Sequence, residues 1–208
     1  MSEHPPQGWR QVVFDEVVEA WLSSGGVKEG DKKARTFVVP TSPRERYLHF
    51  VEHGYLFLRF IPPCDWFRVE VIRPDEVLAL RLIDEESWEH ALAEGERTLG
   101  ARADLIRVTA LHGARVRELA GDANLMPLLD GRVVLFGHQP SGPLSILDGN
   151  HRLLALAHRL AVRGEPLVPF HMYVGLSQGP CRWHGDPVEW VERPGRTPGV
   201  RRYILKVW

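Results

Sequence analysis

Cysteine is scarce in this chain of 208 residues: it has only Cys64 and Cys181, each next to a proline. The two cysteines form no CxxC motif, and the first six residues have neither the basic region nor the apolar run of a secretory signal. Such cysteine usage favours a reducing cytosol. No stretch approaches the roughly 20 apolar residues that a membrane span needs. We therefore expect a soluble cytoplasmic protein with no membrane partner.

The chain also lacks an excess of charge of either sign. Its 26 Lys and Arg residues nearly balance 27 Asp and Glu residues, for a formal net charge of −1. Proteins that bind nucleic acid usually carry a basic excess, so nucleic acid is not the expected partner, although a local basic patch stays open. The composition is typical of a globular protein, and the length suits one large domain or a domain with a small appendage.

Several common catalytic motifs are missing. The ten histidines include no HExxH, and the glycines match neither a P-loop nor a dinucleotide fingerprint. Ser141 and Ser145 have no nucleophile elbow around them. His138, His151 and His171 flank one apolar strand and could converge as a metal or proton-relay cluster. We expect instead that backbone groups satisfy each of them individually.

The most informative stretch is Ile146–Ala157. A short apolar strand ends in an Asp-Gly turn, and an amphipathic, alanine-rich helix follows almost at once. A helix N-terminus offers unpaired N–H groups and the positive end of the macrodipole, so it can seat a phosphate or carboxylate. His151 and Arg152 add donors, and Asp148 adds a carboxylate for a magnesium ion or a proton. The turn predicts an anion site with chemistry beside it.

A simpler interpretation is that Asp148 and Asn150 only cap the helix, as both residue types often do. His151 and Arg152 would then be first-turn surface residues. However, cations at a helix N-terminus oppose the macrodipole, which prefers acids there. A bound anion would explain their presence, so we favour the anion site.

At these residues the chain resembles the ParB/sulfiredoxin-like superfamily, whose members carry variants of this turn at their phosphate site. The superfamily includes chromosome-partition CTPases, sulfiredoxins and free-serine kinases. The Asp-Gly-His-x-Arg turn of the kinases is close to the Asp-Gly-x-His-Arg turn here. The resemblance extends over about residues 67–176 in the order of elements, and it is specific over Ile146–Ala157.

Two departures narrow the resemblance. Sulfiredoxin chemistry needs a cysteine within the turn, where this chain has Asn150. Partition proteins continue into a helix-turn-helix region, whereas Ala157 is followed here by one strand-like segment and a Pro/Gly-rich tail. The kinase-like or generic nucleotide-binding branch therefore fits better.

The resemblance implies a nucleotide-dependent phosphoryl-transfer or nucleotide-hydrolysing enzyme, such as a small-molecule kinase or NTPase, that uses ATP, ADP or CTP with Mg²⁺. The alternative to an enzyme is a non-catalytic nucleotide- or nucleic-acid-binding regulatory module of the ParB-like type. The implied phosphate-binding residues are Gly149, Asn150, His151 and Arg152. Asp148 would hold the magnesium ion and would share the catalytic role with His151.

A third catalytic residue, Glu76, is also implied by the resemblance. In the serine kinases a strand followed by a Pro-containing turn supplies a glutamate as general base for the substrate hydroxyl, and residues 72–76 match this pattern briefly. The acceptor would be a small hydroxyl compound such as an amino acid. An acidic pair at a helix start is also common for the dipole alone, so both interpretations stay open. The oligomeric state is left open as well.

The expected fold is α+β. We expect a ParB/sulfiredoxin-like core, a mixed sheet with flanking helices, over residues 64–176, after an N-terminal αβ extension over 1–63. An irregular Trp/Arg-rich tail over 177–208 should pack on the core through its tryptophans. Periodicity predicts helices over 11–22, 42–49, 85–98 and 104–119, and strands over 36–39, 55–60, 67–72, 132–136, 144–147 and 167–174.

Overall fold

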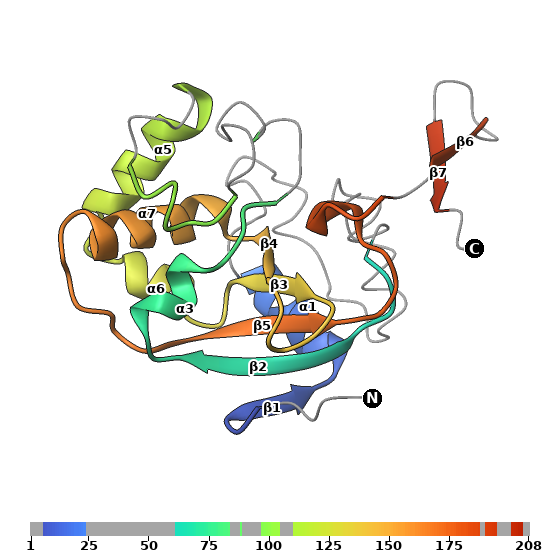
Figure 1. Cartoon of the computed structure of the whole chain (residues 1–208), viewed down its shortest axis with the longest axis horizontal. Coiled ribbons are helices and arrows are strands. Elements are labelled where there is room, and N and C mark those ends of the chain that lie inside the picture. The colour runs from blue at the N-terminus through green and yellow to red at the C-terminus, as the bar shows by residue number, and fades with distance from the viewer. Residues whose placement is uncertain are drawn as a thin grey trace.

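The computed structural model describes residues 6–23, 61–83, 88, 97–104, 110–187, 190–194 and 201–205. These residues form an α+β fold around a mixed five-stranded sheet, which confirms the expected class (Figure 1). The elements predicted over 36–39, 42–49 and 55–60, and most of the helix predicted over 85–98, lie outside the described residues.

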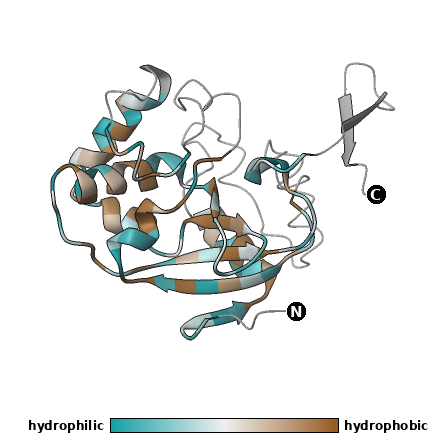
Figure 2. Ribbon diagram, in the orientation of Figure 1, coloured by the Kyte–Doolittle hydropathy of each residue, from teal (hydrophilic) through white to brown (hydrophobic). Residues whose placement is uncertain are grey.

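The sheet has the order β1-β2-β5-β3-β4, and only the central β3–β5 pair is parallel. Teal and brown alternate along β2 in Figure 2, as expected for a strand whose two faces differ in polarity. The strand β3, between β5 and β4, is buried throughout. The strands are β1 (Trp9–Val12), β2 (Asp65–Val71), β3 (Val134–Gly137), β4 (Ser145–Asp148) and β5 (Phe170–Leu176).

Each face of the sheet has its own apolar core. Leu135 of β3 belongs to a large core formed with the helices α3, α5, α6 and α7, whereas Val134 and Phe136 belong to a smaller core formed with α1. The helices are α1 (Phe14–Ser23), α3 (Pro74–Leu78), α5 (Ala110–Gly121), α6 (Leu125–Leu129) and α7 (Asn150–Ala161). Of the helices within the described ranges, none has the length and apolar character that crossing a bilayer requires.

The N-terminal segment differs from the helix predicted over 11–22. Residues 9–12 form β1, which pairs antiparallel with β2, and the helix begins only at Phe14. Val13, which falls within the predicted helix, lies between the two elements with 70% of its surface exposed. Pairing with a distant strand, and not local spacing, decides the structure here.

The tail is more regular than predicted. A 3₁₀ turn, η4 (Arg182–His184), follows β5, and β6 (Trp190–Pro194) pairs antiparallel with β7 (Arg201–Leu205). Within the tail, Cys181 is buried in the smaller core and Trp183 packs against both cores. The start of the tail is therefore part of the packed structure.

Candidate functional site

The predicted turn lies between β4 and α7, as the sequence suggested. Gly149 is the N-cap residue of α7, with a φ of +100° that favours glycine. A Cβ at this position would also lie 3.1 Å from Cγ2 of Val133. Gly149 makes no side-chain cap hydrogen bond to α7. Gly149 is itself buried, and its lack of a side chain leaves the first helical N–H groups, which have no intrahelical partners, without a side-chain cap from the N-cap residue.

Asp148 and Arg152 form an ion pair across this turn. Nη2 of Arg152 lies 3.0 Å from Oδ2 of Asp148, and its Nη1 donates to the carbonyl of Leu128 at 2.7 Å. The Arg152 side chain is only 15% exposed, whereas that of Asp148 is 32% exposed. Burial lowers the pKa of Arg152, and the Asp148 carboxylate opposes that shift. The guanidinium charge is therefore balanced within the fold.

Asn150 is used inside the structure. Its Oδ1 accepts the backbone N–H of Ile83 at 3.1 Å, and its surface is 8% exposed. Arg81, two residues earlier, pairs parallel with Ser145 of β4 through backbone hydrogen bonds. The side-chain oxygen of Asn150 thus accepts the backbone N–H of Ile83 just beyond this short ladder. This hydrogen bond holds residues 81–83 against the start of α7.

His151 belongs to an aromatic cluster. Its Nε2 lies 2.8 Å from Nδ1 of His112, and Trp88 stacks on His112 with ring centroids 4.0 Å apart. Burial, followed by the charges of His112, Arg115 and Arg152, lowers the pKa of His151 to about 4. His151 is therefore neutral at pH 7, and it can offer a hydrogen bond but no positive charge to an anion.

Glu76 faces a different part of the molecule. Its Oε2 accepts the backbone N–H groups of Ile72 and Arg73 at 3.2 and 3.0 Å, which closes a capping box at the start of α3. The side chain lines a cavity of about 640 Å³ together with residues of β1, β2 and the 140–144 loop. None of residues 148–152 lines this cavity, although α3 packs against α7. Glu76 therefore lines a cavity that the turn does not line.

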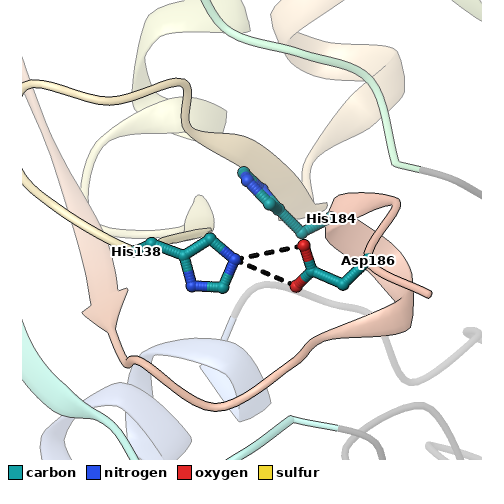
Figure 3. A group of neighbouring side chains, drawn as sticks. All are labelled: His138, His184 and Asp186. Carbon is teal, nitrogen blue, oxygen red and sulfur yellow. Dashed lines mark hydrogen bonds and ion pairs between the residues drawn. The ribbon is translucent and has the colours of Figure 1, made fainter. Parts of the chain in front are cut away.

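A second polar cluster lies at the opposite end of β4 and consists of His138, His184 and Asp186 (Figure 3). One ligand-type atom from each of the three lies within 4.8 Å of the others. Nε2 of His138 is 3.0 and 3.1 Å from the two carboxylate oxygens of Asp186. The cluster joins the loop after β3 to the turn that ends η4.

Each member of this cluster is held by a further group. Nδ1 of His138 lies 2.7 Å from the carbonyl of Ser177, and Nδ1 of His184 lies 2.9 Å from Oγ of the buried Ser145. The backbone N–H of Cys181 donates to Oδ2 of Asp186 at 2.7 Å. The orientation of all three side chains is therefore fixed.

The pKa values of the two histidines are shifted in opposite directions. Burial lowers the pKa of His138, but its hydrogen bonds to Ser177 and Asp186 and the Asp186 charge outweigh this effect and raise the pKa overall. Burial is also the largest influence on His184, and it lowers the pKa of that residue against the opposing Asp186 charge. The different balance follows from the direct contact of His138 with the carboxylate.

The three histidines that flank the strand do not gather in one place. His151 contacts His112, and Nδ1 of His171 lies 3.0 Å from Oδ1 of Asp130. His138 meets a backbone carbonyl, as expected, but also two tail residues that the sequence analysis did not select. The sequence signal for these two residues was the tripeptide at 184–186, in which Gly185 separates a histidine from an aspartate. In the structure Gly185 has a φ of +93°.

Comparison of the chain with protein-family models, curated proteins and solved structures finds no match. The similarity of residues 146–157 to the ParB/sulfiredoxin-like superfamily therefore stays a prediction from that motif.

Proposed function

We propose that this protein binds the phosphates of a nucleotide at the turn between β4 and α7, and that it transfers or hydrolyses the terminal phosphoryl group there. The observation that carries the proposal is that the N-terminus of α7 has no side-chain cap. Its N-cap residue is Gly149, which makes no side-chain hydrogen bond to the first helical N–H groups. Such N–H groups, with the helix dipole, favour phosphate oxygens. In this proposal the core is of ParB/sulfiredoxin-like type and the ligand is ATP, ADP or CTP.

Each residue of the turn has a distinct role in this proposal. Gly149 supplies the positive φ of the turn, and the backbone N–H groups of Asn150, His151 and Arg152 bind a phosphate. His151 adds a neutral ring that can donate or accept a hydrogen bond. Arg152 forms an ion pair with Asp148 and so positions the carboxylate of that residue.

Magnesium fits the turn through Asp148. Mg²⁺ commonly binds one or two protein carboxylates together with substrate phosphates, and Asp148 is the partly exposed carboxylate beside the first turn of α7. When bound, the ion would neutralise charge on the phosphate oxygens. Glu76 is given no role in this proposal, because its carboxylate caps α3 and lines a cavity that residues 148–152 do not line. The phosphoryl acceptor is therefore left unassigned.

The second candidate function is a non-catalytic nucleotide-binding module. It is favoured by the internal hydrogen bonds of Asn150, His151 and Arg152, which leave Asp148 as the main reactive group of the turn. Such a module would bind nucleotide saturably and release no product.

The test is calorimetric titration of the full chain with MgATP, MgADP and MgCTP, followed by the same titrations of Asn150→Asp. This change keeps an oxygen acceptor for Ile83 and places a negative charge at the first turn of α7. We expect about tenfold weaker binding, since a repulsion of about 1.4 kcal/mol corresponds to that factor. Asn124→Asp, the same change at the N-cap of α6, should leave affinity unchanged.

Two results would overturn the proposal: no binding at millimolar nucleotide, or equal affinity in Asn150→Asp and the native chain. Assays of phosphate release then separate the two candidates. Asp148→Asn should reduce turnover more than binding if the site is catalytic. Saturable binding with no product in the native chain would support the module.

A further inference from the structure

We propose that His138, His184 and Asp186 form a binding site for one divalent transition-metal ion of the Zn²⁺ or Fe²⁺ type. The site is separate from the turn at α7, and it does not depend on the function proposed for that turn. Two imidazoles and one carboxylate suit these ions, whereas Mg²⁺ and Ca²⁺ prefer sites built from oxygen ligands alone.

The hydrogen bonds of His138 indicate where its proton lies. A carbonyl can only accept a hydrogen bond, so the contact with Ser177 places the proton of the neutral ring on Nδ1. The lone pair of Nε2 then faces both carboxylate oxygens of Asp186 at 3.0 and 3.1 Å. Two electron-rich groups at this distance need a cation between or beside them, which is either a proton or a metal ion.

His184 is placed to act as a further ligand. Its ring lies beside that of His138, with ring centroids 4.9 Å apart and the planes nearly perpendicular. Figure 3 shows His184 next to the contact between His138 and Asp186. A simple ion pair between His138 and Asp186 does not require a second imidazole at this place. A metal ion bound by His138 and Asp186 would gain a further nitrogen ligand from it.

The distances between the three ligand-type atoms are compatible with metal coordination after a small adjustment of the side chains. Metal–ligand bonds of about 2.0–2.2 Å place the ligand atoms of a tetrahedral ion roughly 3.4 Å apart. The three ligand-type atoms here lie within 4.8 Å of one another, and the closest pair is at 3.0 Å. Movement of side chains alone, on the order of 1 Å, would complete the geometry.

Each proposed ligand also has a hydrogen-bond partner that holds its orientation. Metal-binding histidines usually donate their second nitrogen to a carbonyl, carboxylate or other acceptor, which fixes the tautomer and the ring orientation. His138 has the carbonyl of Ser177, and His184 has the hydroxyl of the fully buried Ser145. Asp186 is oriented by the N–H of Cys181. The aromatic ring of Phe136 packs edge-on against both imidazoles.

The site would also be accessible. His184 is buried, but the side chains of His138 and Asp186 keep part of their surface exposed. Three protein ligands leave at least one coordination position for water or a substrate, the arrangement found in catalytic metal sites.

The experiment uses the full chain after removal of metal with EDTA. Zn²⁺ is titrated by calorimetry, and Co²⁺ is added separately to report coordination through its visible absorption. We expect one equivalent of each ion to bind. Asp186→Asn should abolish saturable binding, although its amide oxygen can still accept the Cys181 N–H group.

The chain supplies a matched control. His171 and Asp130 form a similar histidine–aspartate contact at 3.0 Å, and within the described residues they are not part of the metal-type cluster. Asp130→Asn should leave metal binding unchanged. Ser145→Ala removes only the group that orients His184, and we expect it to reduce affinity by about tenfold while the protein stays folded.

Absence of saturable Zn²⁺ and Co²⁺ binding to the native chain would overturn the proposal. So would binding that Asp186→Asn and Ser145→Ala leave unchanged while circular dichroism shows both variants folded. The cluster would then be only an ion pair that joins η4 to the loop after β3. Neither result would change the outcome expected for nucleotide binding at α7.

Discussion

The side-chain oxygen of Asn150 accepts the backbone N–H of Ile83 at 3.1 Å, across 67 residues of sequence. Because this amide is buried, Asn150→Ala would leave the N–H group of Ile83 without its acceptor. We expect a loss of about 1–3 kcal/mol in the free energy of unfolding, measured by urea denaturation. Asn124→Ala changes an exposed asparagine that makes no cap hydrogen bond, and it should cost less than about 0.5 kcal/mol. Equal losses would contradict this role of Asn150.

The ion pair at the turn should be important for stability. Arg152→Ala removes hydrogen bonds to Asp148 and to the carbonyl of Leu128, and it leaves that carboxylate without its partner. We expect a loss of about 1.5–3 kcal/mol in the free energy of unfolding. The control is Arg115→Ala, because Arg115 pairs with Glu118 at 2.7 Å on the surface. Such exposed pairs contribute about 0–1 kcal/mol. A loss for Arg152→Ala that is no larger than the control's would refute the expectation.

Three glycines separate backbone strain from lack of space. Gly149→Ala should be the most destabilising change, because it combines a φ of +100° with a Cβ 3.1 Å from Val133. Gly131→Ala meets only the positive φ, whose cost is about 1–2 kcal/mol. Gly121→Ala meets neither obstacle and should be neutral or slightly stabilising. Thermal or urea unfolding of the three variants tests this order, and any other order would contradict it.

Stability should fall as the solution becomes acidic. The pKa of His151 is about 4 in the folded protein against an ordinary value of 6.5, so the unfolded chain takes up a proton before the folded chain does. The contribution of His151 is therefore complete above about pH 6.5, and it is lost as the pH falls toward 4. Urea unfolding between pH 7 and pH 4 should show this loss. His151→Gln, which does not titrate, should show a shallower dependence over that range.

NMR titration checks the same assignment directly. The ring of His151 should stay neutral at pH 6, whereas an exposed histidine is largely protonated by pH 5.5 or so. A midpoint for His151 near 6.5 would show that burial does not control its protonation.

Local sequence patterns were sufficient for some elements. The apolar run before Asp148 and the spacing of leucines and alanines after it predicted β4 and α7, because both depend on residues close together in the chain. In contrast, β1 exists through its pairing with β2, where Trp9 lies opposite Val69 and packs against Phe67. A segment of four residues carries too little local signal to specify such a partner.

The chemistry of the candidate sites was harder to predict than the turn itself. The sequence identified Asp148 and Arg152 as neighbours on one helix turn, but not the burial that makes Arg152 an internal partner or keeps His151 neutral. His138 and Asp186 are 48 residues apart, and they meet only because η4 packs beside β4. Contacts of this kind depend on the finished fold.

The short ladder between Arg81 and β4 has a consequence for association between copies of the chain. β4 is the last strand in the sheet order, and an open strand edge invites pairing with another molecule. Arg81 occupies the outward-facing carbonyl of Leu144 and the N–H of Ile146, so this edge is already covered. Because Asn150 holds residues 81–83 in place, its loss would expose the edge of β4. The Asn150→Ala variant should therefore form β-rich aggregates on mild heating sooner than the native chain does.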